Sequence, residues 1–368
     1  MALIVGNTVV YKPSEYSPLI GVRIRELFDK ARFPQDVFRL VTGDGATGAA
    51  LVKSGVNKIA FTGSVRTGKA IMAACAENLT PVTLELGGKD PLIVFEDADL
   101  DVASSAAVWG AFLNSGQVCA SVERVYVHAG VASKFTDLVV EKTRKLRQGV
   151  GLNDDVEVGS MTAEMQLKIV EEHVEEAKKR GAQILCGGER NRDLKGYFYK
   201  PTVLTHVDRS FKIVRDETFG PVMPIMTFTN EDEVVTLAND SAYALDAYVW
   251  TKDVARGKRV ASRLVAGTVN INESVFSHAL PQAPWGGPKA SGLGRTHGAL
   301  GLLDLVEVRH VHLNTANKKK NYFWWYNYSK DKIELYKIMA QMFFGKGVLH
   351  RMWNLLKFLA KLSKLKVD

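Results

Sequence analysis

The chain contains few cysteines, and they are not grouped. Cys75, Cys119 and Cys186 are the three cysteines among 368 residues, and they lie far apart in the sequence. Such spacing provides neither a disulfide framework nor the paired ligands of a structural metal site. We therefore expect a protein of a reducing compartment, the cytoplasm, with no bound metal.

Long apolar runs are also missing. The opening segment, residues 1–5, is a short apolar run without a basic stretch before it, so it does not look like a secretory signal. No run near the C-terminus approaches the roughly 18 apolar residues that a bilayer-spanning helix needs. The sequence therefore predicts neither secretion nor a membrane-spanning helix.

The net charge of +8 is concentrated at one end of the chain. Residues 318–368, called the C-terminal tail below, contain twelve Lys and Arg and three Asp and Glu, which gives 12 − 3 = +9. Residues 1–317 therefore carry 8 − 9 = −1. A body this close to neutrality is not typical of a nucleic-acid-binding protein, so nucleic acid is not an expected partner.

In the first part of the chain, short β-branched runs alternate with amphipathic segments. This alternation predicts an α/β fold in which helices connect the strands of a parallel sheet. Gly43, Gly45 and Gly63 stand in joints of the kind where ligands approach the backbone in such sheets. The expected strands are 7–12, 37–41, 58–61 and 81–84, and the expected helices are 18–30, 46–54 and 67–77.

A second α/β unit is expected after residue 86, and the sequence shows no internal repeat. Residues 305–314 alternate apolar and polar side chains, which predicts an extended strand. The other expected strands are 91–95, 122–128, 201–207, 221–228, 247–250 and 267–271, and the other helices are 100–115, 133–148, 161–180, 232–239 and 254–264.

Cys119 is the candidate nucleophile. It lies in the segment Asn114–Ser121, whose small residues allow backbone N–H groups to approach the sulfur. Only the thiolate attacks efficiently, so a reactive cysteine needs such dipoles or a neighbouring base to ionise it. An arbitrary cysteine is more often a small buried hydrophobic residue, and we interpret Cys75 and Cys186 in that way.

Glu85 is the candidate base. It stands 34 residues before Cys119, at the end of an expected strand and ahead of Gly87 and Gly88. A glutamate at a strand end is more often a solvated charge, but the glycine pair allows close packing and a movable carboxylate. A partly apolar cleft would raise its pKa, which suits a group that must deprotonate water to hydrolyse a thioester.

Six segments, in this order along the chain, resemble those of the aldehyde dehydrogenase superfamily. The resemblance covers roughly residues 1–317 and implies a partial Rossmann-type parallel sheet followed by a second α/β catalytic domain, with a helical C-terminal tail. The segments are Gly6–Glu15, Phe61–Gly68, Leu84–Lys89, Asn114–Ser121, Glu217–Pro221 and Pro284–Gly292. The implied divisions are a partial NAD-binding domain (1–86), a catalytic domain (87–288), a return segment with an oligomerisation strand (289–317) and the tail (318–368).

The same resemblance implies NAD as the cofactor. Lys12 and Glu15 match residues that hydrogen-bond the adenine ribose, and a carboxylate at Glu15 accepts from a 2′-hydroxyl but repels a 2′-phosphate. Gly63 and Ser64 match a turn whose helix N-terminus faces the phosphates, although this glycine pattern is a weak signal when taken alone.

The implied chemistry is oxidation of an aldehyde to a carboxylic acid. Glu217 and Phe219 match residues that hold the nicotinamide ribose and pack near the ring. Cys119 attacks the aldehyde to form a thiohemiacetal, hydride passes to the cofactor, and water activated by Glu85 hydrolyses the thioester. Members of the coenzyme-A-acylating branch commonly lack a glutamate at the position of Glu85, so the resemblance implies a non-acylating enzyme. A homo-oligomer, dimer or tetramer, is expected through the strand at 305–314.

Members of the superfamily carry a longer N-terminal portion with a Pro-Trp-Asn block, whose asparagine contributes to the oxyanion hole. That block is missing here, and loss of one such donor costs about 10²–10³ in rate. We expect the chain to be a fragment or to have a mis-assigned start. Two alternatives stay open: another chain completes the fold, or this is a truncated, non-catalytic membrane-associated or oligomer-partner protein that retains it.

The C-terminal tail lies outside the resemblance. A basic amphipathic helix next to aromatic residues is typical of a peripheral membrane anchor, and packing on the body or on a partner subunit is the alternative. Membrane contact would favour apolar or long-chain aldehydes as substrates, since these partition into lipid. The expected apolar face has Leu349, Met352, Trp353, Leu356 and Leu359, and the polar face has His350, Asn354, Lys357, Lys361 and Lys364.

Overall fold

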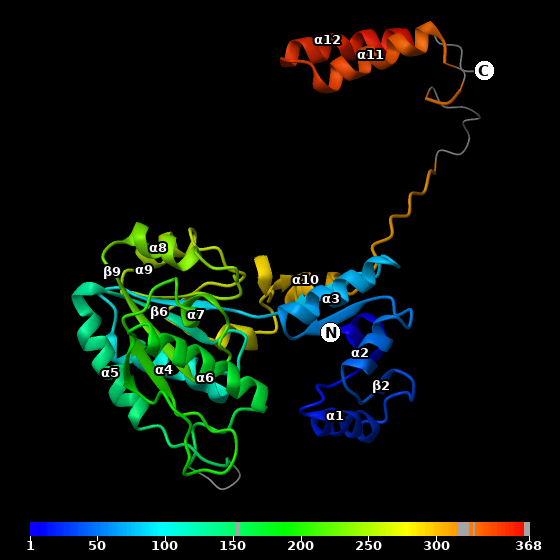
Figure 1. Ribbon diagram of the computed structural model, residues 1–368. Helices are drawn as coiled ribbons and strands as arrows, with labels where there is room; N and C mark the ends of the chain where they lie inside the picture. Colours follow the sequence, from blue (N-terminus) through cyan, green and yellow to red (C-terminus); the bar gives the residue numbers. More distant parts are fainter. Residues whose placement is uncertain (152–154, 316–323, 327, 364–368) are drawn as a thin grey trace. The chain divides into compact units, whose positions relative to one another are not determined.

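A computed structural model describes residues 1–151, 155–315, 324–326 and 328–363 (Figure 1). The chain divides into two compact units, Met1–Glu307 and Val308–Asp368. The boundary falls inside the expected return segment, 289–317. The division of the first unit into a cofactor-binding and a catalytic domain stays a prediction.

The first four strands pair in parallel as expected, but they form two sheets and not one. β1 (Val9–Tyr11) pairs with β2 (Phe38–Leu40), and β3 (Ile59–Thr62) pairs with β4 (Val82–Glu85), which β12 (Gly292–Leu293) joins in antiparallel orientation. Strands that follow one another in sequence need not be hydrogen-bonded, and β2 and β3 are not neighbours in any sheet. The intervening helices are α1 (Pro18–Lys30), α2 (Gly45–Val52) and α3 (Val65–Ala76).

A seven-stranded sheet forms the centre of the larger part of the first unit (Figure 1). Its strand order is β11-β10-β5-β6-β9-β8-β7, and all pairs are parallel except β7 with β8. β7 was not predicted, because this short edge strand is only partly buried and lacks a clear alternation. The strands are β5 (Asp90–Val94), β6 (Val122–His128), β7 (Gln183–Cys186), β8 (Thr202–Thr205), β9 (Val222–Phe228), β10 (Tyr248–Trp250) and β11 (Asn270–Ile271).

Helices cover both faces of this sheet, as Figure 1 shows. Successive side chains of a strand point to opposite faces, so Leu92 packs with α4 (Leu100–Phe112) and α5 (Ala132–Arg144), whereas Ile93 packs with α8 (Glu231–Asn239) and α9 (Val254–Ala261). A third apolar cluster joins β8 and β9 to α6 (Glu164–Lys179) and α7 (Lys212–Arg215). These apolar clusters thus fix the strands of the sheet, and the loops described below begin at the ends of these strands.

The predicted strand at 305–314 is wrong for the single chain. After α10 (Gly298–Leu303) the described segment 305–315 contains no strand, and Val308, Val311 and Leu313 are exposed. An extended segment forms a ladder only when a neighbouring strand accepts its backbone hydrogen bonds. None pairs with it in the described part of this chain.

The C-terminal tail forms two helices, α11 (Lys330–Phe344) and α12 (Val348–Leu362), of which only the second was predicted separately. Lys361 of α12 forms an ion pair with Glu334 of α11, and Leu335 and Asn354 are buried. Lys364, assigned to the polar face, lies outside the described residues. Among the helices that the structure describes, none is both long and apolar enough to cross a membrane.

Candidate functional site

The turn before Cys119 has an unusual backbone. Asn114 and Ser115 have φ angles of 51° and 60°, left-handed values that are uncommon outside glycine, and Gly116 follows at 72°. This ends α4 at Phe112, three residues before the predicted end. The Asn114 side chain donates to the Gln117 carbonyl (3.1 Å), and Ser115 Oγ donates to the Gly159 carbonyl (2.9 Å). These bonds hold the strained turn from which Cys119 leads into β6.

Two glycines allow neighbouring loops to meet at this turn. A Cβ atom on Gly116 would lie 2.1 Å from the Gly220 carbonyl oxygen, and one on Gly88 would lie 2.1 Å from the Cys119 carbonyl oxygen. Both contacts involve backbone atoms, so a side chain cannot move aside to relieve them. The loop that follows Glu85 and the loop that contains Glu217 are therefore both packed on the Cys119 turn.

Glu85 ends β4 and is buried, with 9% of its surface exposed. Both of its carboxylate oxygens are buried, and the Thr296 side chain approaches closely enough to oppose the rise in its pKa. Burial raises the pKa of Glu85 to about 7, against the opposing effect of the Arg295 charge. A Cβ on Gly286 would lie 2.8 Å from Glu85 Oε1, so the glycine after Trp285 provides room for this carboxylate.

The Cys119 thiol is not ionised by its surroundings alone. Burial, together with the charges of Asp90 and Glu85, raises the pKa of Cys119 to about 12, and the Ala120 N–H opposes this rise. A nucleophilic role for this thiol would therefore require that another group accept its proton. Glu85 influences the thiol electrostatically and has a pKa near neutrality, so it is suited to accept that proton.

Glu217 lies against the loop that follows Glu85. The Gly88 N–H donates to Glu217 Oε1 (3.0 Å), and a Cβ on Gly87 would lie 2.4 Å from Glu217 Oε2. Burial, followed by the charge of Glu123, raises the pKa of Glu217 to about 7. Phe219, two residues on, is half-buried with a left-handed φ of 48°. The structure thus brings together the segments of Glu85, Cys119, Glu217 and Phe219.

The remaining predicted cofactor residues lie on other elements. Lys12 follows β1 and donates to the carbonyls of Pro13 and Gly43 (2.8 Å each), with Glu15 Oε2 at 3.8 Å. Ser64 caps α3 by accepting from the Thr67 N–H (3.2 Å). The Gly63 N–H donates to the Glu85 carbonyl (3.0 Å), so this turn adjoins the end of β4. The binding roles of Lys12, Glu15, Gly63 and Ser64 stay predictions.

Sequence reasoning missed a group of buried polar residues beneath the Glu217 loop. Glu123 and Arg124 interrupt the otherwise apolar strand β6, and both are almost completely buried. Lys and Glu side chains are seldom fully buried without a partner. The charged pair inside an apolar strand was therefore a signal that could have been recognised in the sequence.

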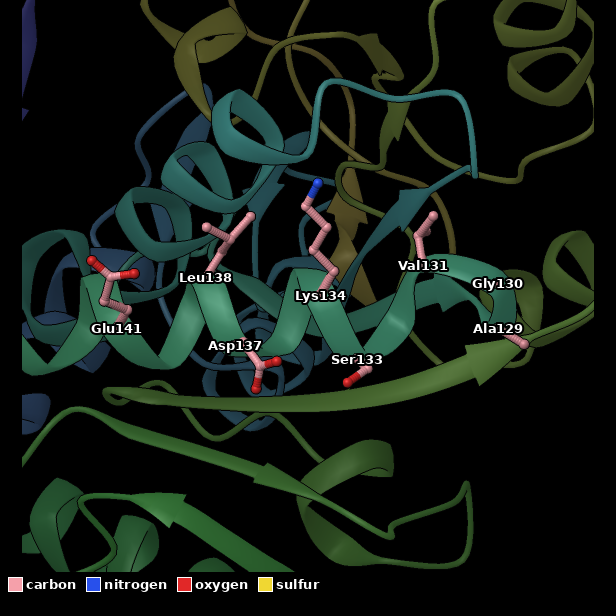
Figure 2. Close-up of a pocket in the computed structure, with 8 residues that line it drawn as sticks. All are labelled: Ala129, Gly130, Val131, Ser133, Lys134, Asp137, Leu138 and Glu141. Carbon is pink, nitrogen blue, oxygen red and sulfur yellow. The ribbon is translucent and has the colours of Figure 1, made fainter.

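A surface pocket elsewhere has no part in this site. It lies along the first turns of α5, where Figure 2 shows Ser133, Lys134 and Asp137 among the lining side chains. None of the residues discussed above lines it. Within the described part of the chain, no three His, Cys, Asp or Glu side chains are grouped as metal ligands would be.

Fold and site together define an α/β protein in which a cysteine turn, a buried glutamate and a second acidic loop meet beyond parallel strands. Comparison with known sequences identifies the group to which it belongs. The profile of the aldehyde dehydrogenase family matches residues 1–311, and this chain is a member of that family.

Individual relatives agree with this assignment. Betaine aldehyde dehydrogenase from Bacillus subtilis (strain 168) is 42% identical over 327 residues, which is 88% of this chain and 66% of that protein. A Bacillus cereus aldehyde dehydrogenase solved as an NAD⁺ complex is 42% identical with a TM-score of 0.81, covering 84% of this chain and 62% of that one. Betaine aldehyde dehydrogenase from Staphylococcus aureus, also solved with NAD⁺, is 39% identical with a TM-score of 0.82, covering 87% and 64%. The chain thus spans about two thirds of the length of its relatives.

Proposed function

We propose that this protein oxidises an aldehyde to a carboxylic acid with NAD, as a non-acylating aldehyde dehydrogenase. The observation that carries the proposal is the meeting of the Cys119 turn, Glu85 and the Glu217 loop in one place, with Gly88 in contact with both Cys119 and Glu217. The family membership and the NAD⁺ complexes of two relatives support the cofactor.

The residues present fit that cofactor. Lys12 offers a hydrogen-bond donor, and the exposed carboxylate of Glu15 offers acceptors, to the hydroxyls of a ribose. Ser64 stands at the N-terminus of the twelve-residue helix α3, and a helix N-terminus is suited to bind phosphate. The Glu217 carboxyl lies against Gly87, where a larger residue would clash with it. When bound, NAD supplies the hydride acceptor.

The chain's own residues perform the other steps. Cys119 Sγ forms a bond to the aldehyde carbon as its proton is transferred to Glu85 and the C=O π electrons move to oxygen, which gives the thiohemiacetal as its alkoxide. Loss of hydride from that carbon leaves a thioester on Cys119. Glu85 releases the thiol proton to solvent and, again a carboxylate, removes a proton from water as that water attacks the thioester. The C–S bond then breaks, the sulfur of Cys119 takes the proton back from Glu85, and the acid leaves.

Cys119→Ser tests the proposal. We expect NADH formation with a panel of aldehydes to fall by roughly 10³-fold or more, because a hydroxyl is a far weaker nucleophile than a thiolate. Cys186→Ser, at the edge strand β7, is the matched control and should retain activity. Dehydrogenase activity that survives Cys119→Ser would contradict the mechanism, and an inactive parent chain would favour the non-catalytic alternative.

We also propose that the C-terminal tail places this otherwise cytoplasmic protein at a membrane surface, with apolar or long-chain aldehydes as substrates. Polar side chains of α12 face its partner helix: Asn354 is buried and Lys361 pairs with Glu334. The apolar face of α12 is exposed, and Lys357 lies over the Trp353 ring (5.5 Å) at its border. Vesicle binding tests this contact.

A homo-oligomer, dimer or tetramer, is the third part of the proposal. In segment 305–313, Val308, Val311 and Leu313 are exposed at 86%, 75% and 79%, and this segment belongs to no sheet of the described residues. Pairing with the sheet of a second copy would supply the missing ladder partner. Sedimentation velocity measures the resulting mass.

A further inference from the structure

A buried polar cluster lies directly beneath the loop that carries Glu217. Lys89, Glu123, Thr218 and His173 expose only 1%, 2%, 1% and 7% of their surfaces. Burying charged groups costs free energy unless each is paired and hydrogen-bonded. The stability of this cluster therefore depends on the ion pair and the hydrogen bonds among its members.

Glu123 is the centre of the cluster. Its Oε2 accepts from the Thr218 N–H (2.8 Å) and its Oε1 from the Phe219 N–H (2.9 Å). Lys89 Nζ donates to Glu123 Oε2 (2.5 Å) and to Thr218 Oγ1 (3.1 Å), and His173 Nδ1 lies 3.2 Å from the same hydroxyl. A single carboxylate thus holds two successive backbone N–H groups and is itself neutralised by a buried ammonium group.

These bonds act on a strained part of the loop. Phe219 has a left-handed φ of 48°, which a bulky residue adopts only when the surroundings enforce it. Hydrogen bonds to an ionised acceptor are roughly twice as strong as neutral ones, and two of them from one carboxylate fix direction as well as distance. Gln166 Nε2 adds a bond to the Thr218 carbonyl (2.8 Å) from α6.

The same cluster also holds the opposite side of Glu217. Lys89 directly follows Gly88, whose N–H donates to Glu217 Oε1 (3.0 Å). The Lys89–Glu123 ion pair therefore links the loop after Glu85 to the Glu217 loop, with the Glu217 carboxyl between them. Arg124, the next residue on β6, instead donates to the Lys89 and Ala238 carbonyls. Of the two neighbouring charged residues on β6, Glu123 is thus the one that binds the loop carrying Glu217 and Phe219.

We propose that Glu123 is a positioning residue, which through Lys89 and the Thr218 and Phe219 amides holds Glu217 and Phe219 in the geometry that binds the nicotinamide end of NAD. The link to NAD rests on the proposed function, whereas the hold on the loop does not. Glu123 makes no hydrogen bond to the Cys119 turn among the described residues, so its loss should affect the cofactor more than the thiol chemistry.

Hydrogen–deuterium exchange of Glu123→Gln and Glu123→Ala in the full chain tests the hold on the loop. Glu123→Gln has nearly the same shape, but it loses the charge and replaces one acceptor oxygen with an N–H donor; Glu123→Ala loses both acceptors. We expect exchange at the Thr218 and Phe219 amides to accelerate about tenfold or more, since each loses a charge-assisted bond. The control is Glu233→Gln, which removes a similar carboxylate from a surface cap that accepts from the Thr229 N–H (2.8 Å). Unchanged exchange at residues 218 and 219 in both Glu123 variants would overturn the proposal.

Kinetics of Glu123→Gln tests the link to NAD. We expect KM for NAD to rise about tenfold, with hydrolysis of p-nitrophenyl acetate, which needs Cys119 and Glu85 but no NAD, within about twofold of the parent. An equal loss of ester hydrolysis and NADH formation would indicate a general structural role and overturn this assignment. If the parent chain forms no NADH, the proposed function fails, and the exchange experiment still decides whether Glu123 holds the loop.

Discussion

Burial raises the pKa of both principal side chains of the site, with different consequences for their protonation. It raises the pKa of Glu85 to about 7, where a carboxyl is ready to exchange protons near neutral pH, and it raises the pKa of Cys119 to about 12, where a thiol stays protonated. In the proposed mechanism, Glu85, whose charge acts on the Cys119 thiol, accepts the proton that the thiol releases.

The pH dependence of turnover follows from Glu85. The group acts as a base only when ionised, so as pH falls below about 7 we expect kcat to fall about tenfold per pH unit, and above that pH to level off. Glu85→Gln should lower kcat at pH 8 and remove this inflection. The measurement is kcat from pH 5.5 to 8.5 for parent and variant. A Glu85→Gln enzyme with the parent's inflection near 7 would show that another group is responsible.

At the residue scale, the sequence predicts functional side chains where the adjacent residues in the chain form an informative pattern. Cys119 and Glu85 were predicted because small residues and glycines flank them. Glu123 was missed, since its partners Thr218 and Phe219 lie 95 and 96 residues away and no local pattern connects them.

The loops at strand ends determine how the site is assembled. β4, β5 and β6 place the loop after Glu85 beside the Cys119 turn, and the loop before β9 adds Glu217. These loops make backbone contact at glycines. A small change in one loop is therefore transmitted to the others.

Gly88→Ala tests this arrangement. The new Cβ would lie 2.1 Å from the Cys119 carbonyl oxygen, so we expect the Cys119 turn to move and kcat to fall by about tenfold to a hundredfold. Gly151→Ala is the control, because a Cβ there meets no atom within 4 Å. NADH formation and circular dichroism separate a displaced turn from a lost fold. Parent-like kcat in Gly88→Ala would contradict the contact.

Sequence periodicity located most elements but not all of their ends or partners. The helix predicted at 100–115 stops at Phe112, because Asn114 and Ser115 adopt left-handed angles that a helix excludes. The strand at 305–314 is absent from the single chain, since a strand depends on a neighbour that alternation alone does not specify.

At the scale of the whole molecule, charge and exposed apolar surface are distributed unevenly along the chain. Residues 1–317 are nearly neutral, whereas the C-terminal tail carries +9 and the exposed apolar face of α12. Basic and apolar groups together attract anionic lipid.

Flotation with anionic phosphatidylserine vesicles checks this property. We expect the full chain to float, a chain without residues 318–368 to remain in solution, and Leu356→Glu, on the exposed apolar face, to float weakly. Binding should weaken at high salt, because the lysines act through screened charges. Thermal unfolding of the shortened chain should match that of the body in the full chain, since Met1–Glu307 is compact by itself. Equal flotation with and without the tail would remove the membrane proposal.

The sequence by itself determined the α/β class, most helices and strands, and the candidate nucleophile and base, because periodicity, glycines and small flanking residues act over short stretches of chain. The tertiary structure alone decided that Gly88 lies against Cys119, that Glu123 holds the Thr218 and Phe219 amides, and that Asn354 of α12 is buried. Burial and hydrogen bonding join segments distant in sequence, and packing decides which of them meet.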